Sequence, residues 1–458
     1  GVMAGFSQGG GVGLMLAQWM IEGEPERDTS AMDVARFGQN WINPGYTLPK
    51  VIENYQKRFS VSYPNEELPA ARPLRTTPMY DTFDAMGAVW GAQFGLEVVN
   101  YFAKGDEPRY ETPSFRRSNA WEATKREVLG VRNGVGINEV HNFGKYKVTG
   151  PNARDWLDRI MAGRIPKEGR ISLTPMLSPK GRLIGDFTVS CLGQDDFQLT
   201  ASYGAQDFHM RWFLQNQSEG VQIENISDRL NGFQIAGPKA RDVLTACTRS
   251  DISDMKFMDV RKITVGMTDC TVQRVSYTGD LGYEIYCDPM DQRTLWSTLW
   301  AAGQDHDMVP FGMRAMMSLR LDKFFGSWMA EFSPDYTPCE TGMDRFISWK
   351  KNTDFIGRAA AEAERDTGAA RQLVVFEVDA EDADVVAYEP VWIDGSVQGF
   401  CTSGGFSHYS EKSIAYALIP RDKVTPGLTV DIEILGQMRS ATLLDSPLFD
   451  ADNARMRG

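Results

Sequence analysis

The feature that most constrains the fold is an irregular alternation of strands and helices in the middle of the chain, from about residue 77 to 358. Short β-branched runs typical of strands cover 145–150, 186–192, 196–202 and 263–277. Helical patterns cover 152–162, 204–217, 238–247 and 290–303. The two kinds interleave without the repeat of about 30 residues that a βαβ unit needs. The sequence therefore favours an α+β fold over a doubly wound parallel sheet.

The last part of the chain has a different pattern. Residues 370–450 are dense in strand-like runs separated by glycine turns, at 372–380, 390–404, 413–420 and 428–443. Many short strands with close turns are typical of a small barrel or sandwich. We predict a C-terminal β-barrel domain here, following the α+β domain at 77–358.

Size and charge limit the classes of protein and partner. A length of 458 residues predicts two or three domains, and 42% hydrophobic with 24% charged residues is a globular composition. Lys and Arg number 48 against 61 Asp and Glu, which gives a formal net charge of −13. This balance argues against nucleic acid or an anionic membrane as the main partner. An anionic ligand would need a local cluster of basic residues.

The cysteines and histidines argue against a metal centre. Six cysteines are scattered singly without a CxxC pair, and none of the four histidines has a second at metal-ligand spacing. We therefore expect no metal, and the isolated cysteines fit a reducing compartment, the cytoplasm or, in a eukaryote, the mitochondrial matrix. The sequence contains no run of about 18 apolar residues, so we predict no membrane-spanning helix.

A single carboxylate stands in the strand-like segment 180-KGRLIGDFTVS-190. Asp186 follows Gly185 and is flanked by apolar residues, so it lies either on the polar face of a strand or half-buried. A half-buried carboxylate needs a partner or a cationic ligand. The alternative is a solvated strand residue or a turn acceptor.

A second segment, 274-RVSYTGDLGYEIY-286, places an aromatic hydroxyl and a carboxylate on either side of a turn. Gly279 and Gly282 allow a tight reversal that returns the chain alongside itself. Tyr277 and Glu284 then lie near each other. They form either a ligand contact or a plain hairpin with a core tyrosine and a surface glutamate.

Together these two segments resemble the folate site of the aminomethyltransferase family, which includes the T-protein of glycine cleavage. The resemblance implies that Asp186 lies beside the reacting nitrogens of tetrahydrofolate. There it would orient the folate, accept a proton and stabilise an iminium-like cation. Many family members carry two adjacent carboxylates at this point, whereas this chain has Gly185 before Asp186. Asp186 must then act alone.

The same resemblance assigns the folate contacts. It implies that Tyr277 stacks on the pterin and that Glu284 accepts two hydrogen bonds from its amino-pyrimidine edge. Arg320 resembles a family arginine that reaches the folate, where a guanidinium matches a carboxylate of the glutamyl tail. Tyr409 lies where the last domain of the family folds over the cleft, and is a further candidate contact. Around His141 the chain departs from the family pattern, and a lone histidine is more often structural.

The N-terminal segment points to a flavin. Residues 1–25 are predicted to form a glycine-rich loop that runs into a helix ended by Gly23 and Pro25. Glycines let backbone N–H groups approach a ligand closely, although most such stretches are only flexible turns. The segment resembles the last flavin-contacting segment of amine-oxidising flavoenzymes, which implies that Gly9, Gly10 and Gly11 contact FAD. The bulk of such an FAD domain is missing, so we expect the chain alone to hold flavin poorly.

Further motifs narrow the resemblance to the C-terminal part of dimethylglycine and sarcosine dehydrogenase-like flavoenzymes. They are the run ending in YPNEELPA-x-RPLR before residue 76 and the block from KFFGSW to PDYTP near residue 330. The implied domains are an FAD-domain edge at 1–30, a linker at 31–76, the folate-binding domain at 77–358 and the barrel at 370–450.

The implied function is methylene transfer to tetrahydrofolate, with a methylated amine as donor and a missing FAD domain or subunit as partner. Two alternatives stay open: a methyltransferase for another methylated osmolyte, and a folate-binding regulatory subunit without turnover. The sequence leaves the identity of the amine and the oligomeric state open.

Overall fold

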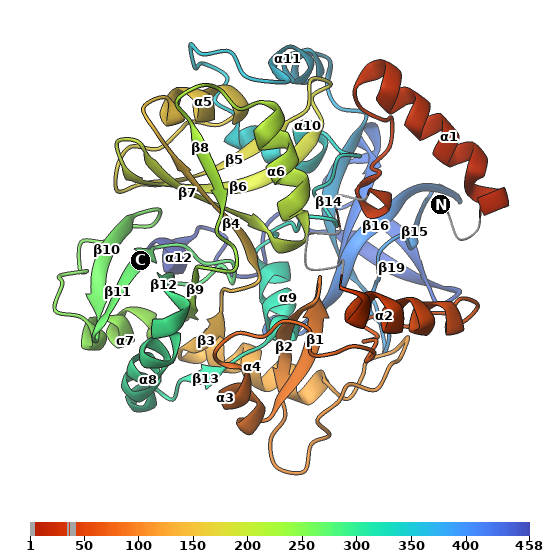
Figure 1. Cartoon of the computed structure of the whole chain (residues 1–458). Helices are drawn as coiled ribbons and strands as arrows, with labels where there is room; N and C mark the ends of the chain where they lie inside the picture. The colour runs from red at the N-terminus through yellow and green to blue at the C-terminus, as the bar shows by residue number, and fades with distance from the viewer. Residues whose placement is uncertain (1–4, 34–35, 37–42) are drawn as a thin grey trace.

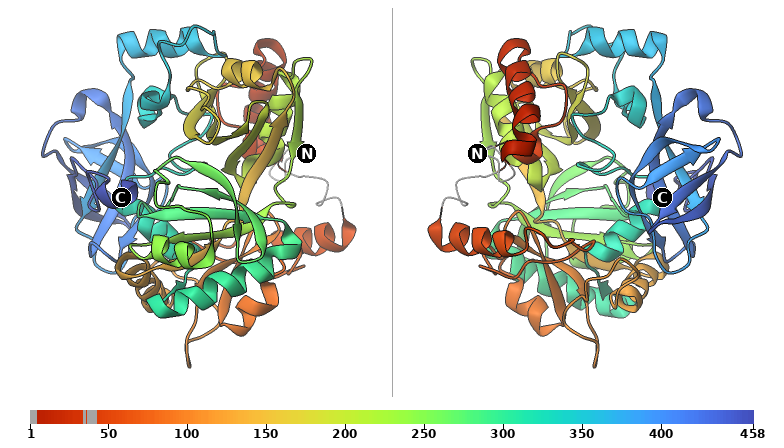
Figure 2. Two further views of the ribbon diagram at one scale, coloured as in Figure 1. Left: turned by 90° about the vertical axis from the view of Figure 1, so that its left-hand side faces the viewer. Right: turned by 90° about the vertical axis from the view of Figure 1, so that its right-hand side faces the viewer.

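The computed structural model describes residues 5–33, 36 and 43–458 (Figure 1). Two β-sheets with helices packed on them form the middle of the molecule, and a closed barrel follows at the C-terminus. In Figure 2 the barrel, in blue, lies at one side of these sheets. The α+β fold and the C-terminal barrel predicted from the sequence are both confirmed.

The first sheet is five-stranded, in the order β5-β6-β7-β4-β8. Its neighbouring strands are antiparallel. Helices α5 (Ala153–Ile160) and α6 (Gln206–Gln215) cover its apolar face, where Trp156, Phe187 and Phe213 share one core. The strands are β4 (Phe143–Thr149), β5 (Ile171–Leu177), β6 (Leu183–Gly193), β7 (Asp196–Ser202) and β8 (Gln222–Asn225).

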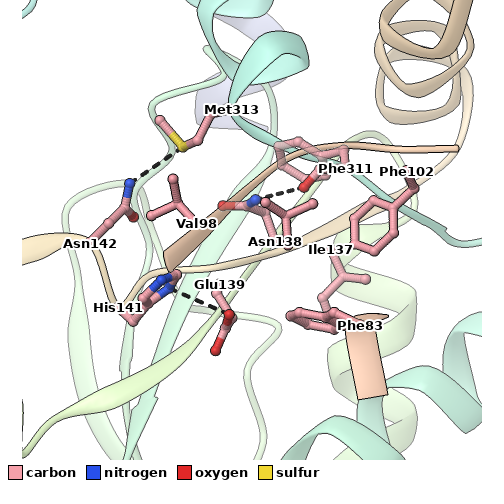
Figure 3. Close-up of a pocket in the computed structure, with 11 residues that line it drawn as sticks. Phe83, Val98, Phe102, Ile137, Asn138, Glu139, His141, Asn142, Phe311 and Met313 are labelled. Atoms are coloured by element: carbon pink, nitrogen blue, oxygen red, sulfur yellow. Dashed lines mark hydrogen bonds and ion pairs between the residues drawn. The ribbon is translucent and has the colours of Figure 1, made fainter. Parts of the chain in front are cut away.

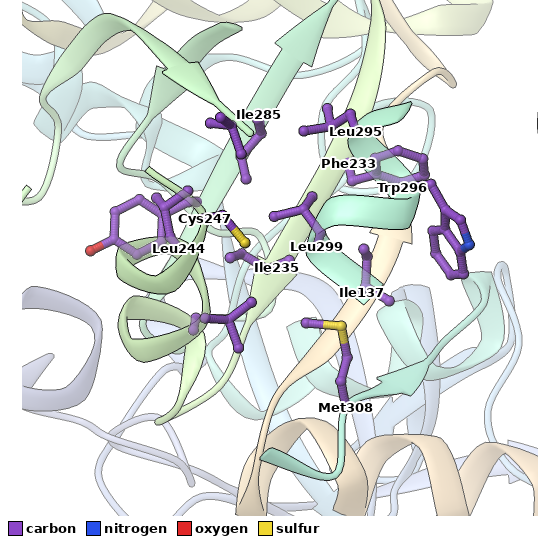
Figure 4. Packing of buried hydrophobic residues seen from close by; sticks show 14 of the residues in the cluster. Ile137, Phe233, Ile235, Leu244, Cys247, Ile285, Leu295, Trp296, Leu299 and Met308 are labelled. Carbon is purple, nitrogen blue, oxygen red and sulfur yellow. The ribbon is translucent and has the colours of Figure 1, made fainter. Parts of the chain in front are cut away.

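The second sheet is six-stranded, in the order β10-β11-β12-β9-β3-β13, with β13 parallel to β3. Helices α7 (Ala240–Cys247) and α8 (Gln292–Gly303) pack on one face, and Figure 4 shows Leu295 and Leu299 of α8 beside Ile137 and Phe233. The strands are β3 (Gly136–Glu139), β9 (Asn231–Ala236), β10 (Val260–Val265), β11 (Thr268–Gln273), β12 (Gly282–Cys287) and β13 (Val309–Pro310).

The barrel closes in the order β14-β17-β16-β15-β18-β19. Helix α9 (Met313–Asp322) joins it to the sheets, since Ser318 Oγ donates a hydrogen bond of 2.8 Å to the Phe406 carbonyl. The barrel strands are β14 (Arg371–Val378), β15 (Pro390–Ile393), β16 (Ser396–Ser407), β17 (Lys412–Pro420), β18 (Thr429–Ile434) and β19 (Gln437–Leu443).

The N-terminal part differs from the prediction. Residues 5–22 form one helix, α1 (Gly5–Glu22), so the expected glycine loop is wrong over the described residues. The cost of glycine in a helix, about 1 kcal/mol each, did not prevent it. The helix expected near residues 48–59 is α2 (Pro44–Gln56). A hairpin of β1 (Ala88–Gln93) and β2 (Leu96–Phe102) follows, with α3 (Tyr80–Ala85) and α4 (Trp121–Asn133) beside it.

The run 263–277, predicted as one strand, contains a turn. Strands β10 and β11 pair as an antiparallel hairpin that reverses at Gly266, whose φ is +60°. Glycine adopts this left-handed conformation without the steric penalty of a Cβ. The chain can therefore reverse at this residue. The remaining short helices are α10 (Pro338–Thr341), α11 (Arg358–Thr367) and α12 (Ala454–Arg457).

Candidate functional site

Strand β6 separates apolar from polar side chains by simple alternation. Phe187 and Val189 belong to the core beneath α5 and α6. Asp186, Thr188 and Ser190 occupy the alternate positions, so they project from the opposite face of the five-stranded sheet. The register extends this polar face, because Ser190 pairs with Gln198 of β7, and Thr188 pairs with Thr200, which in turn pairs with Lys145 of β4.

A row of polar side chains also crosses the six-stranded sheet. Gln273 of β11 pairs with Glu284 of β12, which pairs with Gln234 of β9, which pairs with Asn138 of β3. Residues directly opposite one another share a face of a sheet. All four side chains are buried. The residues next to them in sequence face the other way and pack beneath α7 and α8; they include Ile137, Ile235, Val272 and Ile285.

The polar faces of the two sheets are coupled electrostatically. Burial lowers the pKa of Lys145 to about 7, against the opposing effects of Asp228, Glu284 and Glu139. Burial raises the pKa of Glu284, opposed by a hydrogen bond of 2.7 Å from the Tyr286 hydroxyl and by the charge of Lys145. A cation on one sheet thus interacts with a carboxylate on the other. The Lys145 ammonium itself donates to the carbonyls of His141 and Ser227.

We call the polar faces of the two sheets together the polar layer. Several of its buried atoms have no hydrogen-bond partner among the described residues. Unpaired buried polar groups each cost about 1–3 kcal/mol, so such a cluster has hydrogen-bonding capacity that water or a polar ligand can fill. The atoms include Asp186 Oδ1, Ser190 Oγ, Gln198 Nε2, Gln234 Oε1 and both amide atoms of Gln273.

Asp186 is the titratable centre of this layer. Burial raises its pKa from the ordinary 3.8 to about 7, partly offset by a backbone hydrogen bond. The structure also explains why Gly185 precedes it. A Cβ at Gly185 would lie 2.4 Å from Phe187 Cε2 and 2.8 Å from Nε2 of His209. A second carboxylate would therefore enter the apolar core, where burial already lowers the pKa of His209 to about 3.

Tyr277 lies close enough to Asp186 for the two to interact. Its ring stacks on Phe325 at 6.1 Å, and its hydroxyl donates a hydrogen bond of 2.8 Å to the Gly326 carbonyl. Burial raises the pKa of Tyr277 to about 12, with a lowering effect from Arg320 and raising effects from Glu331 and Asp186. The phenol is therefore un-ionised at neutral pH.

Arg320 lies beside these residues, but its guanidinium is already engaged. It donates to Glu331 Oε2 at 3.0 Å, the Phe325 carbonyl at 3.0 Å and Ser403 Oγ at 2.8 Å. Although burial opposes the charge, Glu331 keeps the pKa of Arg320 above its ordinary value. In this arrangement Arg320 supports the 325–331 loop that receives the Tyr277 hydroxyl, and its Nε–H has no partner among the described residues.

The structure does not bring Tyr409 or the N-terminal glycines to this layer. The Tyr409 ring packs edge-on against Phe449 at 5.4 Å and lies 5.8 Å from the guanidinium carbon of Arg132. Gly9, Gly10 and Gly11 lie within α1, with nothing within 4 Å of a Cβ built on them. Only the first four N–H groups of a helix lack an intrahelical acceptor, and these glycines come after them. Their N–H groups are therefore used in hydrogen bonds within α1.

His141 has a structural place at one end of the polar row. Its Nε2 lies 3.0 Å from the Glu97 carbonyl and its Nδ1 lies 3.5 Å from Glu139. Figure 3 shows both lining a small cavity with Asn138 and Asn142. The cavity has a volume of only about 10 Å³, too small for a ligand larger than water.

A larger cavity of about 410 Å³ is lined in part by residues 329–336, which follow Gly326. Residues from the N-terminal segment, from this loop and from the barrel line it, among them Arg27, Asp335, Arg371 and Tyr388. Groups of three or more His, Cys, Asp or Glu that could hold a metal ion are absent from the described residues. In the same part of the chain no helix has the length and apolarity to cross a membrane.

Sequence reasoning missed Lys145, Gln234, Gln273 and Asn138. Each stands at a polar position of an alternating strand, which ordinarily indicates a solvent-facing side chain. The signal that could have found them is the pairing of strands far apart in the chain, which the sequence alone does not give.

Family comparison matches residues 79–351 to the GCVT N-terminal domain and residues 371–450 to the glycine cleavage T-protein C-terminal barrel domain. The chain belongs to the glycine cleavage T-protein family. Residues 22–77 match the central domain of FAD-dependent oxidoreductases. The segment predicted as a linker is thus related to a domain of flavoenzymes.

Individual relatives agree with this assignment. The mitochondrial dimethylglycine dehydrogenase of Mus musculus is 35% identical over 100% of this chain and 53% of the relative. Sarcosine dehydrogenase of Homo sapiens is 29% identical over 99% of the chain and 55% of the relative. The Bacillus subtilis aminomethyltransferase is 28% identical over 82% of the chain and 99% of the relative.

A solved structure supports the fold. Aminomethyltransferase T of Bartonella henselae superposes with a TM-score of 0.72 at 20% identity, over 82% of this chain and 98% of that one. The chain spans about half the length of the dimethylglycine and sarcosine dehydrogenases that it matches.

Proposed function

We propose that this chain transfers a methylene unit to tetrahydrofolate, as the C-terminal half of an FAD-dependent demethylating dehydrogenase or oxidase of the dimethylglycine and sarcosine type. The observation that carries the proposal is Asp186. Its carboxyl has a pKa of about 7, one oxygen without a partner among the described residues, and a place in the polar layer beside Tyr277.

The polar layer fits a flat heterocycle with donors and acceptors along its edge. Glu284 offers carboxylate oxygens. Gln273, its direct neighbour across the sheet, has an amide whose two polar atoms find no partner among the described residues. Tyr277 supplies an aromatic face. These are the groups that a pterin ring requires, and their hydrogen bonds would remove the cost of leaving them buried and unpaired.

Asp186 would carry the acid–base work. Tetrahydrofolate, when bound, supplies the nitrogens that accept the one-carbon unit. A carboxyl with a pKa near 7 is divided between its protonated and ionised forms at neutral pH, so it can both take and return a proton. Its ionised form would also stabilise a cation in this buried place. Tyr277 stays neutral throughout, because its pKa is about 12.

The N-terminal helices support an FAD-binding half as the partner. Large apolar side chains are exposed along α1 and α2 to an extent unusual for a free surface. They include Phe6, Leu14, Leu16, Met20 and Ile21 of α1, and Leu48, Val51, Ile52 and Tyr55 of α2. The match of residues 22–77 to a flavoenzyme domain supports the occupant we propose, an FAD-binding oxidoreductase domain on the same or another chain.

With that partner in place, Gly9, Gly10 and Gly11 of α1 would border its FAD. Their bare surface on α1 would allow close approach through the Cα atoms rather than through free N–H groups. The donor would be a small methylated amine, and the setting a reducing compartment, the cytoplasm or the mitochondrial matrix.

Calorimetry with tetrahydrofolate tests the binding half of the proposal. We expect micromolar affinity that weakens at least tenfold in both Tyr277→Ala and Glu284→Ala, which is about 1.4 kcal/mol. Asp269→Ala, on the exposed face of β11, is the control and should bind as the native chain does. A folded chain that binds no folate would overturn the proposal.

The transfer step needs a separate experiment. With formaldehyde and tetrahydrofolate supplied, the native chain should form methylenetetrahydrofolate faster than the uncatalysed reaction does. Asp186→Ala should lose this acceleration and keep most of its folate affinity. Binding without acceleration in the native chain would instead support a regulatory subunit, and acceleration only with another methylated solute would support an osmolyte methyltransferase.

A further inference from the structure

The turn that follows Tyr277 is buried, although it connects two strands. Thr278, Gly279 and Asp280 are each shielded from solvent. Gly279 has φ of +76°, and a Cβ there would lie 1.9 Å from Cγ of Lys323. The backbone of the turn is therefore pressed against the stem of Lys323 at the end of α9.

Arg132 of α4 holds the turn from within. It donates hydrogen bonds of 2.9 Å to the Thr278 carbonyl and 3.1 Å to the Leu319 carbonyl. Its guanidinium also lies 3.5 Å from Asp280 and 3.5 Å from Asp322. The side chains of Arg132 and both carboxylates are fully buried, so each depends on its partners for charge compensation.

The segment 449–457 completes this compensation. Arg455 contacts both carboxylate oxygens of Asp280, from Nε at 3.1 Å and from Nη2 at 2.8 Å. The Phe449 ring lies 3.6 Å from the guanidinium carbon of Arg132. Asp450 accepts the N–H groups of Arg455 and Met456, which fixes the segment that carries the arginine.

The opposite end of the turn is fixed by the same segment. Lys323 Nζ donates to Asn453 Oδ1 at 2.8 Å and lies 3.4 Å from Asp450 Oδ2. Three cations and three carboxylates thus balance around the turn: Arg132, Lys323, Arg455, Asp280, Asp322 and Asp450. Removing one cation leaves a buried carboxylate short of a partner, so the turn should loosen.

We infer that residues 449–457 act as a clamp that positions Tyr277 for ligand binding, with Arg455 as its key positioning residue. The inference rests on the proposed folate function. Tyr277 is held at its hydroxyl by the Gly326 carbonyl and through its neighbour Thr278, whose carbonyl accepts a hydrogen bond from Arg132. A bidentate guanidinium fixes both distance and orientation, which a single ammonium contact does not.

Folate affinity, measured in variants of Arg455 and in a control variant of Arg457, tests the clamp. Arg455→Met should weaken tetrahydrofolate binding about tenfold, and Arg455→Lys should give an intermediate loss. Arg457→Met is the matched control, because Arg457 lies on the same short helix with an exposed side chain, and its affinity should be unchanged. Equal affinities for Arg455→Met and the native chain would overturn the clamp.

A double-mutant cycle asks whether Arg455 acts through Tyr277. In a Tyr277→Ala background, Arg455→Met should cost less than threefold in affinity, because the group it positions is gone. A full tenfold loss in that background would contradict the positioning role and indicate general damage to the fold.

Hydrogen exchange on the free protein separates the clamp from the folate proposal. Arg455→Met should speed amide exchange at 277–281 and leave the barrel strand β17 unchanged, while Arg457→Met changes neither. Faster exchange in a chain that never binds folate would retain the clamp and reject the proposed function. Unchanged exchange at 277–281 would reject the clamp whether or not folate binds.

Discussion

At the scale of single residues, the site depends on placing a carboxyl group where ionisation is costly. Asp186 shares its strand with the core residues Phe187 and Val189, and alternation alone directs it to the other face. Glycine at 185 keeps its immediate neighbour small enough for His209. One strand therefore contributes side chains to a tight apolar core and a buried titratable carboxyl to the opposite face.

Asp186→Asn should make stability less sensitive to pH. In the unfolded chain this carboxyl ionises near pH 3.8, and in the folded chain near pH 7. Between these values the native state binds more protons, so native stability falls as pH rises through this window. The asparagine variant should therefore gain on the order of 4 kcal/mol over the native chain at pH 8, and nothing at pH 3.

Urea unfolding at the two pH values measures this difference, with Asp269→Asn as a control for loss of a surface carboxylate. A gain of equal size at both pH values would contradict a raised pKa for Asp186.

Sequence reasoning could find Asp186, Tyr277 and Glu284 because each stands in a local motif with a glycine turn beside it. It could not find Gln234 or Gln273, since their burial follows from strand partners elsewhere in the chain. The structure places Tyr409 beside Phe449 and Arg132, and the folate contacts predicted for Arg320 and Tyr409 remain predictions.

At the scale of elements, a glycine can end a strand but does not always interrupt a helix. The single strand expected at 263–277 is a hairpin because Gly266 reverses it, and the sequence offered only that glycine as a signal. Conversely, the glycines of α1 do not break the helix. A glycine permits a turn without requiring one, so its effect depends on the packing that follows.

Gly279→Ala should be strongly destabilising. The substitution adds the strain of a left-handed φ, roughly 1 kcal/mol, to a clash with Cγ of Lys323, and we expect a total loss of about 2–4 kcal/mol. Gly427→Ala is a matched control, because Gly427 has φ of +72° and open space around its Cβ. Its loss should stay near 1 kcal/mol in urea unfolding. Similar losses in the two variants would show that contact with Lys323 is unimportant.

At the scale of the whole molecule, buried hydrogen bonds and an ion pair connect the barrel to the rest of the chain. Glu331 accepts hydrogen bonds from Arg320 of α9 and from Thr402 and Ser403 of the barrel. Arg117 pairs with Asp384 at 2.9 Å. The loop beside Tyr277 therefore depends on barrel docking, which is how the barrel contributes to the site.

The exposed apolar surface of α2 should drive association. Val51→Glu should leave Tm unchanged, because Val51 is 56% exposed, and should reduce self-association of the isolated chain or its binding to an FAD-binding half. Leu435→Glu, at 47% exposure on the barrel, should change neither property. Sedimentation velocity compares the three proteins. Equal sedimentation of the Val51 variant and the native chain would remove α2 from the interface.

The order of the strands along the chain has a consequence for folding. Strands β4 to β8 are contiguous in sequence and make the whole five-stranded sheet, whereas β3 precedes them and must wait for β9 to pair. Contacts between distant residues close more slowly than local ones, because more chain entropy is lost before they form. The five-stranded sheet can therefore form as a local unit, but the row from Gln273 to Asn138 cannot. Ligand-binding competence should be among the last properties that a refolding chain acquires, well after most of its secondary structure.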